Sequence, residues 1–116
     1  MYLADLGNDA LSGYVIKLIQ DKVKTELLEY KHLLDELYQR YSEEDIKRAI
    51  DLGISRVGNK VYMQTDNLNG EILRFIEYGT GRTKPLQLVT KAVRFIMGGR
   101  VWIIVLIIIL VHIIKP

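Results

Sequence analysis

The side chains that could support catalysis are few, and their spacing matches no catalytic pattern. The two histidines, His32 and His112, are eighty residues apart, and the chain has no cysteine. Three carboxylates follow one another at Glu43-Glu44-Asp45. Adjacent positions on a helix point in different directions and do not converge on one metal ion, so these acids are better suited to the first turn of a helix.

A second candidate for chemistry is the glycine-rich segment Gly79-Thr80-Gly81-Arg82-Thr83-Lys84. A phosphate-binding loop needs four residues between its first glycine and the Gly-Lys-Ser/Thr sequence, and it follows a buried strand. This segment has neither feature, so we reject a nucleotide site. With no other constellation in the chain, we expect a protein that is not an enzyme and holds neither a metal nor a cofactor.

Charge is distributed unevenly along the 116 residues. Residues 1–78 hold ten Lys and Arg against fourteen Asp and Glu, whereas the remainder holds six basic residues and no acid. The basic residues that precede the hydrophobic end of the chain are candidates for contacts with DNA phosphates, without base recognition. The alternative is a solvated helix face or a rim of salt bridges to an acidic neighbouring subunit, and it is favoured because no aromatic or groove-reading element accompanies the charges. These residues are Arg82, Lys84, Lys91 and Arg94.

The end of the chain is hydrophobic, because Val101–Ile114 has a single polar side chain, His112. A small soluble domain does not leave such a stretch in water. Trp102, with Arg100 before the stretch and Lys115 after it, is typical of a membrane interface. Fourteen residues form a helix of about 21 Å, however, and a bilayer core of about 30 Å needs about twenty residues. Val and Ile also dominate the stretch, and they favour strands over helices.

We therefore expect residues 101–114 to be buried either against other protein subunits or in a membrane. Burial against neighbouring subunits is favoured, because the stretch is short for a membrane span. Whether its backbone is a strand or a helix stays open. The side chains expected to be buried in either case are Trp102, Ile104, Leu106, Ile108 and Leu110.

The spacing of apolar residues predicts one long helix from about Asp9 to Tyr41. At 1.5 Å per residue it would span roughly 50 Å, which is longer than so small a domain is wide. A helix of this length needs partners along it, which indicates oligomerisation. The residues that form its apolar stripe are Val23, Leu27, Tyr30, Leu34, Leu37 and Tyr41.

A second, shorter helix is predicted over Glu43–Leu52. Ser42 is suited to accept a hydrogen bond from the backbone N–H of Asp45, and Gly53 is suited to a left-handed C-cap. Three more elements are expected after it. They are a hairpin of Ile54–Val57 and Lys60–Thr65 turning at Gly58-Asn59, a short helix Glu71–Tyr78 ending at Gly79, and an amphipathic helix Pro85–Met97 ending at Gly98-Gly99. For Glu71–Tyr78 a strand is the alternative.

The predicted fold class is α+β. The order is a long N-terminal helix, a short helix, a β-hairpin, an amphipathic C-terminal helix and a strongly hydrophobic tail. Residues 1–99 would form one domain, and residues 100–116 a hydrophobic C-terminal segment.

One stretch resembles a known family. Phe75-Ile76-Glu77-Tyr78-Gly79-Thr80, followed by Pro85-Leu86 and a helix over Lys91–Met97, is similar to the tail-completion, or head–tail connector, proteins of long-tailed bacteriophages. In that family a long helix and a hairpin precede a segment like Tyr-Val-Glu-Phe-Gly-Thr. The order of elements fits from residue 9 to about 97. Ser42–Asp45 departs from the family pattern, and so does the apolar tail.

The resemblance implies a structural virion protein that assembles in the host cytoplasm as a ring of six at the phage neck. The ring would join or terminate the tail between portal or adaptor proteins and tail-tube proteins, and DNA would pass through it without sequence-specific contacts. Two alternatives come from the residues themselves. One is a small tail-anchored membrane protein with a cytoplasmic helical domain, and the other is a DNA-binding accessory protein.

Overall fold

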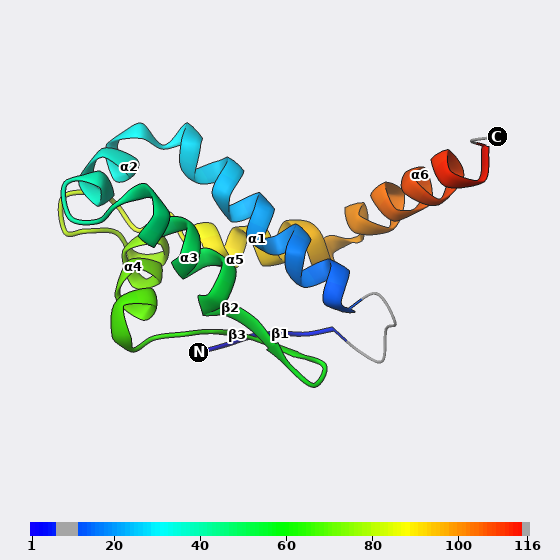
Figure 1. The fold of residues 1–116 in the computed structure, drawn as a ribbon, viewed down its shortest axis with the longest axis horizontal. Coiled ribbons are helices and arrows are strands. Elements are labelled where there is room, and N and C mark those ends of the chain that lie inside the picture. Colours follow the sequence, from blue (N-terminus) through cyan, green and yellow to red (C-terminus); the bar gives the residue numbers. More distant parts are fainter. Residues whose placement is uncertain (7–11, 115–116) are drawn as a thin grey trace.

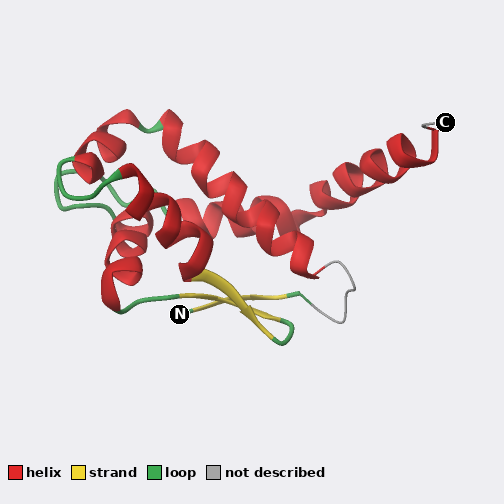
Figure 2. Ribbon diagram, viewed as in Figure 1, coloured by secondary structure: helices red, strands yellow, loops and turns green. Residues whose placement is uncertain are grey.

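The computed structural model describes residues 1–6 and 12–114, with side chains placed for all of these except residues 12 and 99–105. The fold is α+β, as predicted, and helices lie on one side of a small sheet (Figures 1 and 2). The elements are β1 (Tyr2–Asp5), α1 (Ser12–Glu29), α2 (Lys31–Tyr38), α3 (Glu43–Gly53), β2 (Ile54–Val57), β3 (Lys60–Met63), α4 (Asn67–Tyr78), α5 (Leu88–Phe95), a π-helical turn (Ile96–Arg100) and α6 (Val101–Ile114).

The sheet has three antiparallel strands in the order β1–β3–β2. The predicted hairpin is confirmed, with Ile54 opposite Met63 and a turn at Gly58-Asn59. Val61 and Met63 are completely buried, whereas Tyr62 lies on the other face in an edge-to-face contact with Tyr2. Strand β1 is absent from the prediction, because four residues are too few to show an alternating pattern.

The core is one cluster of aliphatic side chains between the helices and the sheet. Each helix from α1 to α5 turns an apolar stripe inward, as its residue spacing dictates. The sheet contributes Ile54 along with the two buried residues of β3. The buried helical residues include Ile19, Val23 and Leu27 of α1, Leu33 and Leu37 of α2, Ile46 and Ile50 of α3, Ile72, Leu73 and Ile76 of α4, and Val89 and Val93 of α5.

The predicted single N-terminal helix is wrong, because the chain leaves helical conformation at Tyr30 (φ −102°, ψ 75°). The break divides the segment into α1 and α2, which meet at an angle (Figure 1). Its physical reason is burial: the core receives Leu27 and then Leu33, six residues apart, whereas Leu34 is only half-buried. No helix longer than its own domain remains, so that argument for oligomerisation is lost. The predicted start at Asp9 lies outside the described residues.

The second helix agrees with its prediction at its start. The Ser42 hydroxyl accepts from the Asp45 backbone N–H at 3.1 Å. Its end differs, because Gly53 is the last residue of α3 and does not adopt a positive φ. A Cβ atom at this glycine would lie 2.3 Å from Cδ1 of Leu73, so the residue is small because α4 packs against it. Helix α4 begins at Asn67, four residues before the predicted start.

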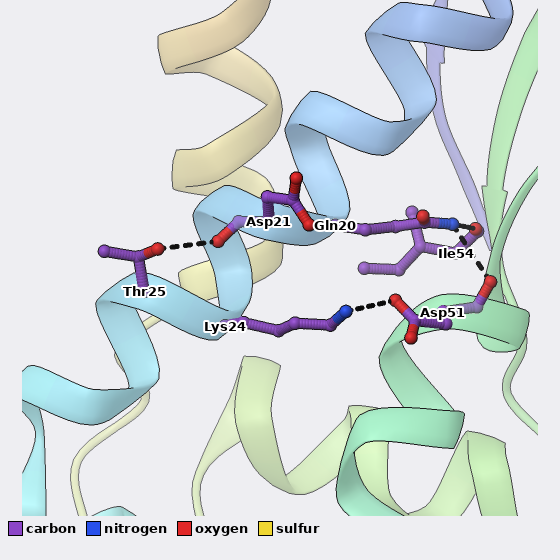
Figure 3. A network of polar contacts seen from close by, with 6 residues as sticks. All are labelled: Gln20, Asp21, Lys24, Thr25, Asp51 and Ile54. Atoms are coloured by element: carbon purple, nitrogen blue, oxygen red, sulfur yellow. Dashed lines mark hydrogen bonds and ion pairs between the residues drawn. The ribbon is translucent and has the colours of Figure 1, made fainter.

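Two side chains, Gln20 and Lys24, join α1 to the junction of α3 and β2 (Figure 3). The Gln20 side-chain amide donates to the backbone carbonyl oxygens of Asp51 at 3.0 Å and Ile54 at 2.8 Å. Lys24, one turn further along α1, places its Nζ 2.5 Å from Oδ1 of Asp51. Because α3 runs into β2 without a loop, these carbonyl groups depend on a donor from outside the helix.

We expect Gln20→Leu to lower the free energy of unfolding by about 1–2 kcal/mol, because the part-buried Ile54 carbonyl loses its side-chain donor, whereas water can replace the donor at the exposed Asp51 carbonyl. Thr25→Ala is the matched control: it removes a hydroxyl that bonds only within α1, to the Asp21 carbonyl at 2.9 Å. The control should change stability by less than about 0.5 kcal/mol. Urea unfolding followed by circular dichroism measures both, and equal losses would contradict the assigned role of Gln20.

Candidate assembly helix and basic cleft

The segment that carries the phage-family resemblance comprises the last turn of α4 and the connection to α5. Glu77 is 1% exposed, and its carboxylate accepts hydrogen bonds from the backbone N–H of Thr90 at 3.1 Å and from the Thr90 hydroxyl. The Glu77 backbone carbonyl accepts from the N–H of Gln87 at 2.9 Å. Thr90 lies in the first turn of α5, so a side chain from α4 satisfies a free N–H group of the next helix.

The prediction that Pro85 occupies the first turn of the last helix is wrong. Helix α5 begins at Leu88, and Gln87 before it has a left-handed conformation (φ 53°). A residue in the left-handed conformation does not fit into a right-handed helix, so α5 cannot extend through Gln87 toward Pro85. Gly79, in contrast, ends α4 as predicted, with φ 84°. A Cβ atom there would lie 2.6 Å from the Thr83 carbonyl oxygen, which explains the glycine.

Three other motif residues, Phe75, Tyr78 and Thr80, make contacts within the fold. The Phe75 ring lies 6.3 Å from the Tyr41 ring and 4.9 Å from the Arg40 guanidinium. The Tyr41 hydroxyl donates to Glu71 at 2.5 Å; burial raises the pKa of Tyr41 to about 12, and this hydrogen bond adds to the effect.

Thr80 donates its backbone N–H to the Thr83 hydroxyl. Tyr78 is 49% exposed, and its hydroxyl lies 3.1 Å from Sδ of Met1.

Two of the four predicted basic residues, Arg82 and Lys84, line an open cleft of about 600 Å³. The opposite wall is the junction of α1 and α2, which adds Lys31 and His32. Of the acids, Glu29 lies in the wall, and Glu36 forms an ion pair with Arg82 at 3.7 Å. We call these surroundings the basic cleft; its remaining lining residues are Tyr30, Leu33, Thr83 and Leu86.

The other two predicted residues are not part of this cleft. Lys91 and Arg94 are exposed on α5. The structure therefore separates the four predicted residues into two pairs. It adds Lys31 and His32, which sequence analysis missed because they lie about fifty residues away along the chain. No local pattern marks them, since they adjoin the loop only after the chain bends at Tyr30.

The hydrophobic segment is the helix α6. The preceding helix does not end at Gly98-Gly99, as predicted, but continues as a π-helical turn directly into α6. Helix α6 projects away from the rest of the molecule, drawn in orange and red in Figure 1. Its described side chains from Leu106 to Ile114 are exposed, except for the half-buried Ile108. Leu110, for example, is 52% exposed. Trp102 and Ile104 lie on its backbone, but their side chains fall outside the described residues.

Among the described residues, no helix is both long enough and apolar enough to cross a membrane. Nor do three acidic or histidine side chains gather within this part of the chain where they could hold a metal ion.

Comparison with protein-family models, with curated proteins and with solved structures finds no match.

We expect Glu77→Gln to lower the free energy of unfolding by about 1.5–3 kcal/mol. The neutral amide loses a charge-assisted hydrogen bond and turns an NH₂ group toward the Thr90 donors. Chemical unfolding of the full-length chain measures the loss. Glu71→Gln is the matched control on the same helix, because Glu71 is exposed and its partner Tyr41 keeps water as an alternative. Similar losses for both variants would contradict a special role for Glu77.

Proposed function

We propose that this chain is a structural protein of the neck of a long-tailed bacteriophage, where copies assemble into a ring that joins or terminates the tail and surrounds passing DNA. The resemblance of the segment from Phe75 to Pro85 supports the class. The observation that supports assembly is the position of α6, an apolar helix that projects away from the core of the molecule. Portal or adaptor proteins and tail-tube proteins are the expected neighbours, and the virion is the expected location.

The distribution of side chains on α6 supports burial by several partners. A helix with one apolar stripe needs one neighbour, whereas a helix that is apolar on all sides is buried on all sides. Between Arg100 and Lys115 the sequence has no charged residue on any face of this helix. One neighbouring helix would cover one stripe only, so a two-fold dimer leaves most of α6 in water. A ring of more copies, with six as the expected number, supplies more surface.

A tail-anchored membrane protein is the second candidate, and one observation favours it. The helical conformation of α6 satisfies its backbone hydrogen bonds internally, as a bilayer requires. This answers the objection that Val and Ile favour strands. The length of fourteen residues still gives only about 21 Å.

We expect polar substitutions on α6 to abolish the ring and leave the fold intact, because the exposed residues of α6 lie outside the core. The variant is Ile107→Gln, Leu110→Gln and Ile114→Gln, which changes one helical face. Its control is Leu52→Gln, Val57→Gln and Leu68→Gln, which changes three exposed apolar residues of the body. Light scattering and negative-stain images of the wild type and the control should give a ring, and the variant a monomer.

A monomeric wild type in the same measurement would overturn the ring. If the wild type instead stays with membranes after carbonate extraction and leaves them only in detergent, the tail-anchored alternative replaces it.

We expect the basic cleft to supply the DNA contacts of the ring. Arg82→Glu with Lys84→Glu should make the negative slope of log affinity against log salt concentration shallower by about 2, since each lost phosphate contact contributes about 0.9. Lys91→Glu with Arg94→Glu is the matched control, with the same charge change on exposed residues outside the cleft. Fluorescence anisotropy with a duplex of arbitrary sequence measures both. Equal slopes for the two variants would contradict a role specific to the cleft.

A further inference from the structure

The end of the molecule opposite α6 carries a second apolar feature. A groove of about 80 Å³ lies between α1, α2 and α3. Its floor is formed by Leu27, Ile46 and Ile50, which are buried core residues. Two exposed side chains stand at its edge, Leu28 at 63% and Tyr38 at 45%. We call this feature the α1–α3 groove; its other lining residues are Lys24, Leu34, Glu43 and Lys47.

The charges around the groove are already paired. Lys24 Nζ lies 2.5 Å from Oδ1 of Asp51, and Lys47 Nζ lies 3.2 Å from Oε1 of Glu43. A groove with apolar walls and internally paired charges offers nothing to a charged ligand. At about 80 Å³ it is also far below the roughly 300 Å³ at which small-molecule sites begin. The occupant that suits it is an uncharged aliphatic side chain presented by a protein surface.

Helix α6 of the same chain is such a surface, but it does not reach the groove of its own molecule. The molecule is 48 Å long, and α6 projects at one end while α2 and the adjoining part of α1 lie at the other (Figure 1). The exposed side chains of α6 include Leu106, Ile107, Leu110 and Ile114, which are uncharged and aliphatic, the chemistry that the groove suits. An α6 helix that reaches an α1–α3 groove therefore belongs to a second copy.

We propose that α6 of one copy packs into the α1–α3 groove of the next copy, with Leu28 and Tyr38 at the contact. This inference rests on the proposed function and specifies the surfaces through which copies assemble. The two surfaces differ, so the contact is head-to-tail, and such contacts close into rings or continue as filaments. At about 80 Å³ the groove receives side chains from one face of α6 only.

The absence of cysteine allows a direct test by cross-linking. The double variant Leu28→Cys with Leu110→Cys changes two exposed positions, so the fold is expected to persist. A short bismaleimide applied to intact producing cells should give a ladder of dimers, trimers and larger species. Val57→Cys with Leu110→Cys is the matched control, because Val57, on β2 and outside the groove, is 67% exposed against 63% for Leu28, and this variant should give no ladder.

The single variants Leu28→Cys and Leu110→Cys distinguish between the outcomes that would contradict the proposal. Dimers from Leu110→Cys alone, with no ladder from the double variant, would show that α6 helices meet each other; the docking proposal would be overturned and assembly would stand. Cross-linking confined to single chains of the double variant would place α6 on its own body and overturn the proposal as well. A monomeric full-length protein that gives no cross-link with any variant would overturn both the docking and the ring.

Discussion

The carboxylate of Glu77 is the one charged or polar side chain that is buried in the described part of the chain, and the direction of the whole C-terminal region depends on it. Burying a carboxylate costs free energy unless donors replace its water. Thr90 supplies two donors, a backbone N–H and a hydroxyl, at the positive end of the α5 dipole. The contact therefore ties the first turn of α5 to α4.

The position of α5 and the turn after it together set the direction of α6. The π-helical turn continues α5 directly into α6, so the orientation of α5 on the core also sets the direction in which α6 projects. Gly79 allows the sharp turn that brings Glu77 and Thr90 together, because its positive φ and its close approach to the Thr83 carbonyl exclude a side chain. The motif that gives the phage-family resemblance is thus a device for positioning a helix. Glu77 has a structural explanation in its contact with Thr90, and Gly79 has one in the turn after α4.

The types of most elements could be predicted from the sequence, since apolar spacing and turn residues mark them locally. The hairpin at Gly58-Asn59 and the Ser42 cap are of this kind. The break at Tyr30 could not be predicted, because neither glycine nor proline marks it and only the packing of Leu33 requires it. The burial of Glu77 had a signal: it lies four residues after Leu73, on the same apolar face of α4.

Two of the four basic side chains that line the basic cleft could be predicted from the sequence. Arg82 and Lys84 stand out as basic residues in a polar loop, but Lys31 and His32 reach them only through the folded chain. Two residues far apart in sequence share a surface when tertiary packing brings their elements together, and no local pattern carries that information. Lys91 and Arg94 belong with the two loop residues when basic residues are counted along the sequence. In the folded chain, however, they lie outside the cleft.

The helical state of the tail shows why residue preference alone was a poor guide. Val and Ile cost up to about 0.7 kcal/mol each in a helix relative to Ala. A strand that is not paired along its edges leaves backbone groups unsatisfied, at about 1–3 kcal/mol each when they are buried. A single apolar segment beyond the sheet therefore gains more from the internal hydrogen bonds of a helix than it loses in side-chain freedom. The preference for strands would prevail only if α6 had a strand to pair with.

The asymmetry of the molecule then bears on how copies could assemble. A contact between α6 and a groove at the opposite end joins unlike surfaces, so nothing in the contact itself limits the number of copies. Closure depends on the angle between α6 and the body, and that angle is set at the turn of Ile96–Arg100. This turn contains Gly98 and has π-helical geometry, which is uncommon in proteins and recurs at functional positions. The geometry of five residues would thus decide between a closed ring and an open filament.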